Sequence, residues 1–257
     1  MGLESRSSEK IHIYMMPGLA ASSSIFKHIR LPEETYEIHL LEWMLPEKKE
    51  PIEDYARRMC ENIKHQDIVL IGMSFGGVLV QEMAAFASIR RLIIISSVKC
   101  RTELPRLMKT ASTTGIFRLL PTGLMSHLDV LSNLPVGDYA KKRIELYKEY
   151  LSVNDTLYLD WAIENMVCWN REEPSEDVVH IHGDQDEIFP IKYIDDCIRV
   201  PGGTHVMILN RFRWFNQHLE EIIETGKLSA QEEMTETRRA SNDPETIEES
   251  SPDWDEK

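Results

Sequence analysis

Short apolar runs recur along most of the chain, separated by segments that are polar or rich in turn-forming residues. The runs are brief and rich in Ile, Val and Leu, which is typical of strands buried on both faces of a parallel sheet. We predict six such strands, at Ile11–Met16, Tyr36–Trp43, Ile68–Met73, Leu92–Ser96, Val178–His182 and Ile198–Val200.

Longer segments with a helical spacing of apolar residues alternate with several of these strands. The clearest are Ile52–Ile63, Val78–Ala87 and, after the last strand, Asn210–Thr225. Strands that alternate with helices indicate βαβ units. The pattern therefore predicts an α/β protein with a mostly parallel, doubly wound sheet of six strands.

Residues 100–174 interrupt this alternation, because they contain no run that predicts a strand. Their last part reads NDTLYLDWAIENMVCWN, which opens with residues that commonly cap helices. It then places Leu157, Trp161, Ile163 and Met166 in a helical register. We predict a helical insertion between the fourth and fifth strands.

Charge is concentrated at the carboxyl end of the 257-residue chain, whose formal net charge is −14. Residues 228–257 hold ten acidic and three basic side chains, a net charge of −7, and almost no apolar residues. Such a segment does not bury enough apolar surface to offset its ordering entropy, so we expect a disordered tail. The negative charge also argues against binding to nucleic acid or an anionic membrane.

Targeting and redox signals are weak. No apolar run is long enough for a membrane span, and the opening MGLESRSSEK lacks the apolar core of a secretory signal. The four cysteines, Cys60, Cys100, Cys168 and Cys197, form no C-x-x-C pair. We expect a cytoplasmic protein with reduced thiols.

One serine lies between a predicted strand and a predicted helix, in the stretch Gly72-Met73-Ser74-Phe75-Gly76. This G-x-S-x-G pattern is typical of a nucleophile elbow, a sharp turn that raises the serine Oγ above the sheet. The same stretch also suits a tight turn without chemistry. A catalytic interpretation therefore requires a base, an acid and an oxyanion hole elsewhere. The other serine cluster, Ser22-Ser23-Ser24, has no such turn and is expected to cap a helix.

Acidic and histidine residues follow the last two predicted strands. Asp184 and Asp186 come after the fifth strand, and His205 comes after the sixth. In doubly wound sheets, ligands bind beyond the carboxyl ends of the strands. The chain order of serine, aspartate and histidine matches the order associated with the G-x-S-x-G elbow.

With these motifs, residues 10–225 resemble the α/β-hydrolase superfamily. The resemblance implies a fold that lacks the first two strands of that family, with strand order 2-1-3-4-5-6. It places the insertion at about 100–174 as a cap within a hydrolase domain of residues 1–227. The family pattern H-G-x-x-D-x-x-x-P implies Asp186 as the triad acid with Ser74 and His205, while Asp184 is expected to cap the loop.

An oxyanion hole needs two N–H donors. One is expected at Phe75, directly after the nucleophile, and the other at Leu19, in the loop after the first strand. Relatives often have His-Gly in that loop, whereas this chain has Pro17-Gly18.

No cofactor or metal ion is expected. The GGTH segment does not complete a dinucleotide-binding motif, and His180 and His182 lack a nearby third ligand. We expect those two to be hydrogen-bonded strand residues. Four other histidines have no motif around them: His12, His28, His39 and His65.

The leading functional hypothesis is a carboxylesterase or thioesterase that works through an acyl-serine and acts on a small, apolar acyl substrate. Apolar residues of the insertion are expected to line the acyl pocket or to form the cap's own core: Leu107, Ile116, Phe117, Leu119, Leu120, Met125, Leu157, Trp161 and Met166. Two alternatives stay open. The same triad supports C–C bond hydrolysis or lyase chemistry in relatives, and a hydrolase-fold receptor binds its ligand without turnover.

Overall fold

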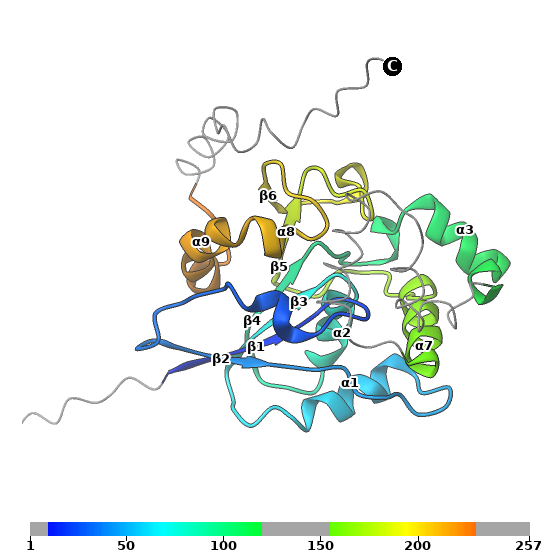
Figure 1. Cartoon of the computed structure of the whole chain (residues 1–257), viewed down its shortest axis with the longest axis horizontal. Helices are drawn as coiled ribbons and strands as arrows, with labels where there is room; N and C mark the ends of the chain where they lie inside the picture. Colours follow the sequence, from blue (N-terminus) through cyan, green and yellow to red (C-terminus); the bar gives the residue numbers. More distant parts are fainter. Residues whose placement is uncertain (1–9, 120–154, 230–257) are drawn as a thin grey trace, which may run out of the picture.

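A computed structural model describes residues 10–119 and 155–229 and contains one parallel six-stranded sheet (Figure 1). The strand order is β2-β1-β3-β4-β5-β6, which confirms the predicted fold class and order. The strands are β1 (Ile11–Met16), β2 (Tyr36–Leu40), β3 (Ile68–Met73), β4 (Ile89–Ile95), β5 (Val178–Gly183) and β6 (Ile198–Val200).

The sheet is buried on both faces, as its continuous apolar runs predict. Along the central strand β3, Ile68 and Leu70 face one apolar cluster, whereas Val69 and Ile71 face another. Successive side chains of a strand point to opposite faces, so an uninterrupted apolar run serves two cores at once. All six residues of β3 are buried.

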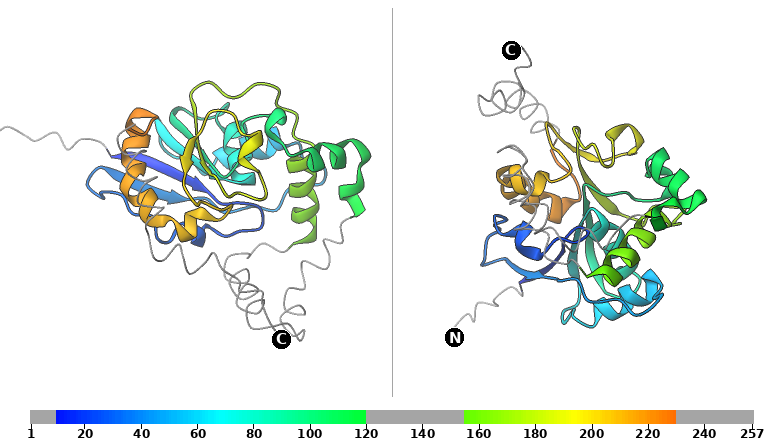
Figure 2. Two further views of the ribbon diagram at one scale, coloured as in Figure 1. Left: turned by 90° about the horizontal axis from the view of Figure 1, so that it is seen from above. Right: turned by 45° about the vertical axis from the view of Figure 1, so that its right-hand side comes forward.

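Helices cover the two faces separately. The helices α1 (Ile52–Cys60) and α2 (Phe75–Met83) pack on one face. The other face carries α8 (Met207–Asn210), α9 (Phe212–Thr225) and the 3₁₀ helix η1 (Ser23–Phe26). Figures 1 and 2 show α9 across the sheet from α1 and α2. No helix within 10–119 or 155–229 combines the length and the apolar character needed to cross a membrane.

The described part of the predicted insertion is helical. It contains η2 (Arg101–Glu103), α3 (Arg106–Thr114), η3 (Ile116–Leu119) and α7 (Thr156–Val167). Asp155 caps α7 by accepting a hydrogen bond from the Tyr158 N–H at 3.2 Å. The helices α3 and α7 lie together at one end of the molecule (Figure 1). The boundaries of the cap and of the hydrolase domain stay predictions. Of the predicted tail, residues 228–257, the structure describes only Leu228 and Ser229, and both contact the folded domain.

The apolar residues of the insertion divide into two groups. Phe117, Trp161 and Met166 are buried, as expected of a cap core, whereas Leu107 and Leu119 are each 80% exposed. Ile116 and Leu157 are also exposed. Leu120 and Met125 lie outside the described residues.

Several predicted boundaries were wrong. Helix α1 ends at Cys60 rather than Ile63, helix α2 ends at Met83 rather than Ala87, and helix α9 begins at Phe212 rather than Asn210. Strand β2 ends at Leu40 rather than Trp43, because the chain then leaves the sheet edge and the Trp43 indole turns toward the loop after β1. Strand β4 begins at Ile89 rather than Leu92, and helix α2 begins at Phe75 rather than Val78.

The predicted serine cap is also wrong in detail. Ser22 precedes η1, but its side chain makes no capping hydrogen bond. The hydroxyl of Ser23 instead donates to the carboxylate of Glu42.

Candidate active site

Ser74 lies in a strained turn between β3 and α2. Its φ of 52° and ψ of −122° fall outside the ordinary regions for an L residue. The turn depends on close backbone contacts: a Cβ on Gly72 would lie 2.3 Å from the Gly76 carbonyl oxygen, and a Cβ on Gly76 would lie 2.2 Å from that of Pro17. Both glycines are therefore required by the turn that presents the Ser74 hydroxyl.

Asp186 is fixed within the loop that follows β5. Its side chain is buried, and Oδ1 accepts hydrogen bonds from the N–H groups of Ile188 at 2.8 Å and Phe189 at 2.9 Å. The other oxygen, Oδ2, lies 2.9 Å from Nδ1 of His205. Two backbone donors thus orient the carboxylate toward the imidazole.

His205 joins the aspartate to the serine. It follows β6, and its Nε2 lies 2.9 Å from the Ser74 Oγ. When Nδ1–H donates to Asp186, the tautomer leaves a lone pair on Nε2, facing the serine. The His205 side chain is 20% exposed and Ser74 is partly exposed, so this relay reaches the surface of the protein.

Asp184 lies in the same loop but has a different partner. Its Oδ1 accepts the N–H of Gly202 at 2.8 Å and so ties the loop after β5 to the loop after β6. This contact is what a loop-capping aspartate would make.

His180 and His182 lie on one face of β5 and are buried. Nδ1 of His182 lies 3.0 Å from Nε2 of His180, and Nε2 of His182 donates to the Phe189 carbonyl at 2.8 Å. Burial lowers the pKa of both imidazoles, most strongly for His180. This pair therefore supports the loop that carries Asp186, through neutral, hydrogen-bonded rings.

The expected oxyanion donors lie on two sides of the serine. Phe75 is the first residue of α2, and the first N–H groups of a helix have no acceptor within the helix. The loop after β1 approaches from the other side, since a Cβ on Gly18 would be 3.3 Å from the Ser74 Cβ. Leu19 follows directly in that loop.

Two aromatic residues that sequence reasoning missed hold the same loop. The Trp43 indole donates to the Gly18 carbonyl at 2.8 Å, and the Tyr158 hydroxyl accepts the Ala20 N–H at 3.1 Å. The two bonded backbone groups belong to the residues directly before and after Leu19. Neither belongs to a motif, so no local signal could have indicated this role.

Comparison with known proteins supports the fold. No protein-family model and no curated protein matches the sequence. Among similar solved structures, an esterase from Exiguobacterium antarcticum has a TM-score of 0.56 at 15% identity, covering 84% of this chain and 93% of the esterase. A thermophilic esterase from Thermogutta terrifontis has a TM-score of 0.56 at 15% identity, and the match covers 85% of this chain and 91% of that esterase. An alpha/beta hydrolase fold protein from Burkholderia ambifaria has a TM-score of 0.56 at 14% identity, and the match covers 82% of this chain and 90% of that protein.

Proposed function

We propose that this chain, which has the α/β-hydrolase fold, is a serine hydrolase that cleaves a carboxylic ester or thioester through an acyl-Ser74 intermediate. The observation that carries the proposal is the continuous relay from Ser74 Oγ through His205 to Asp186, with both links at 2.9 Å. A serine hydroxyl is a weak nucleophile until such a base removes its proton.

In the proposed reaction, Ser74 Oγ attacks the carbonyl carbon while His205 Nε2 takes the hydroxyl proton. The negative charge on the carbonyl oxygen is stabilised by the N–H groups of Phe75 and Leu19. Collapse of this intermediate breaks the bond to the leaving alcohol or thiol, which receives the proton from His205. Water then attacks the acyl-serine while His205 takes its proton. As the bond between the acyl carbon and Ser74 Oγ breaks, His205 returns this proton to Ser74, and the acid product leaves.

Asp186 contributes in two ways. It holds the tautomer of His205 that presents a lone pair to Ser74, and it stabilises the imidazolium formed during attack. Because the carboxylate is buried and receives two backbone N–H groups, its position stays fixed as charge moves onto His205. Preorganisation of this kind lowers the barrier without reorganisation at the moment of reaction.

The proposed substrate is a small molecule with an apolar acyl group, acted on in the cytoplasm. Support for ester cleavage comes from the similar structures, two of which are esterases. The proposal of an apolar acyl group is consistent with the apolar core beside Ser74, where Trp43 and Phe75 are buried with their ring centroids 5.2 Å apart.

A fluorophosphonate probe combined with an ester panel tests this function. We expect the probe to label Ser74 in the full-length chain and the parent protein to hydrolyse p-nitrophenyl esters or acyl-CoA thioesters. Ser74→Ala should abolish both, whereas the matched variant Ser24→Ala, in the 3₁₀ helix η1, should retain both.

Three outcomes would contradict the proposal. Labelling only at another serine would contradict the acyl-Ser74 mechanism. Labelling of Ser74 without turnover of any ester or thioester would favour a ligand-binding protein. Turnover restricted to vinylogous diketones would favour a C–C hydrolase.

A further inference from the structure

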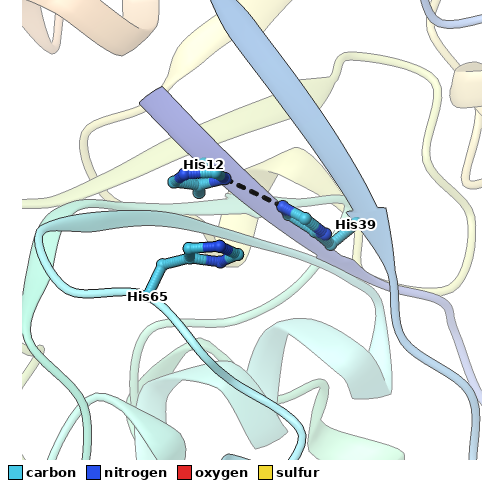
Figure 3. Close-up of side chains that lie close together, drawn as sticks. All are labelled: His12, His39 and His65. Atoms are coloured by element: carbon cyan, nitrogen blue, oxygen red, sulfur yellow. Dashed lines mark hydrogen bonds between the residues drawn. The ribbon is translucent and has the colours of Figure 1, made fainter. Parts of the chain in front are cut away.

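Three histidines from separate segments lie together on the α1 side of the sheet (Figure 3). Their ligand nitrogens all lie within 4.8 Å of one another, and Nδ1 of His12 is 3.0 Å from Nε2 of His39. The third, His65, belongs to the segment between α1 and β3. It precedes the amino end of β3, whereas Ser74 follows the carboxyl end, so this cluster is separate from the candidate active site.

The parallel register explains how the cluster forms. His12 of β1 pairs with Glu37 of β2, and Tyr14 pairs with His39. Residues two apart on a strand share a face, so these four side chains project to the same side of the edge pair β1–β2. The carboxylate of Glu37 lies 3.7 Å from Nδ1 of His12 and 3.8 Å from Nε2 of His39.

We propose that His12, His39 and His65 bind a divalent transition-metal ion of the Zn²⁺ class, with Glu37 as the fourth ligand. Three imidazoles and one carboxylate form a donor set that Zn²⁺ accepts in tetrahedral geometry. Ligand atoms about 2.1 Å from the ion lie roughly 3.4 Å apart. The nitrogens of His12 and His39 are already near this separation.

Tyr14 supplies an outer contact of the kind that orients a metal ligand. Its hydroxyl lies 2.8 Å from Nδ1 of His65 and accepts the N–H of Lys64 at 3.1 Å. When Nδ1–H of His65 donates to this oxygen, Nε2 retains its lone pair. Such outer hydrogen bonds fix the tautomer and the ring of a ligating histidine.

Binding requires one local rearrangement. The rings of His12 and His65 stack with centroids 3.4 Å apart and planes 7° apart. An ion lies in the plane of each imidazole that binds it, so one of these rings must turn about its side-chain torsions. Both His39 and His65 border a groove of about 790 Å³ between the chain after β2 and α1, which provides space and an entry path.

A bound ion would link β1, β2 and the segment before β3. Because β2 is an edge strand, a link at this point would oppose its separation from the sheet. An ion that binds only the folded chain raises its stability. We therefore expect Zn²⁺ to raise the melting temperature as well as to bind.

The test uses the untagged full-length protein, freed of metal with a chelator that is then removed. Isothermal titration with Zn²⁺ alone should give one ion per chain. His39→Gln and His65→Gln should each weaken the affinity roughly tenfold or more and reduce the rise in melting temperature at a given Zn²⁺ concentration. The exposed His28, outside the cluster, gives the matched control His28→Gln, which should bind as the parent does, and so should His205→Gln.

Glu37→Gln keeps the test decisive even if the histidine variants do not fold. The Glu37 side chain is 50% exposed, so this variant is expected to fold as the parent does. It should weaken Zn²⁺ binding while the melting temperature without metal stays that of the parent. The proposal is overturned if the parent shows no saturable binding. It is equally overturned if the cluster variants bind Zn²⁺ as tightly as His28→Gln does.

Discussion

Two aspartates two positions apart, in the loop after β5, have different partners and should therefore respond differently to the same change. Asp186→Asn replaces the oxygen that faces His205 with an amide N–H₂ donor, which favours the wrong tautomer of the imidazole, so we expect kcat to fall by about 10⁴-fold with little loss of stability. Asp184→Asn alters only the contact with Gly202 and should keep most of the activity. Steady-state kinetics and melting curves of both variants measure this. Equal losses of kcat would contradict the assignment of the triad acid.

The hydroxyl of Tyr158 gives a second prediction for a single residue. Tyr158→Phe leaves the N–H of Ala20 without its partner, which costs about 1–3 kcal/mol of stability and loosens the loop that carries Leu19. We expect kcat on an ester substrate to fall roughly tenfold, because the oxyanion loses one well-placed donor.

The control for this positioning role is Tyr36→Phe. Tyr36 is also buried, but its hydroxyl donates to the Glu224 carboxylate of α9 at 2.8 Å, away from the loop. It should lower the melting temperature without lowering kcat. If both variants reduce kcat alike, Tyr158 acts only through general stability.

At the scale of elements, apolar runs predicted the strands well wherever both faces are covered. The start of β4 was missed because Arg90 and Arg91 interrupt its apolar run. Arg90 pairs with Asp67, while Arg91 donates to the carbonyl at Ile223 near the end of α9. Charged side chains fit a strand at its uncovered end, and local composition does not reveal which end that is.

The two candidate sites also differ in how far the local sequence predicts them. Ser74 was predictable because its turn imposes glycines at fixed neighbouring positions, a constraint written locally in the sequence. His12, His39 and His65 were not grouped, because only strand register and the path of the chain after α1 bring them together. Contacts set by tertiary pairing leave no fixed spacing along the chain.

Strand β5 carries a prediction about acid stability. Burial first, and then the charges of His182 and Lys99, lower the pKa of His180 well below its usual value. In the unfolded chain a histidine takes up a proton near pH 6.5, so below this pH the unfolded state binds more protons than the folded state. The free energy of unfolding should therefore fall as the pH drops through this range, by up to about 1.4 kcal/mol per pH unit from His180.

Urea unfolding at several pH values between about 7.5 and 5.5 measures this slope. His180→Gln should reduce the slope of the unfolding free energy against pH by the equivalent of up to one bound proton, whatever its effect on absolute stability. The exposed His28 again provides the control, since His28→Gln should keep the slope of the parent. Identical slopes in all three proteins would show that His180 does not titrate on unfolding.

At the scale of the whole molecule, half of the net charge belongs to a segment whose composition predicts no packed core. The ten acidic and three basic residues counted from residue 228 all lie after Ser229. Leu228, by contrast, packs against the apolar cluster beneath α9, and the hydroxyl of Ser229 donates to Glu221 at 2.6 Å. The last contacts of the described chain with its core therefore fall just before the acidic segment.

A chain that ends at Ser229 should consequently keep the kcat/KM and melting temperature of the full-length protein, because the deletion removes almost no apolar surface. A chain that ends at Gly226 also loses Leu228 and Ser229 and should melt at a lower temperature. Comparing the two truncations by calorimetry separates the acidic segment from the contacts that precede it. If the chain ending at Ser229 already melts as low as the chain ending at Gly226, the acidic segment contributes to stability and the prediction from its composition is wrong.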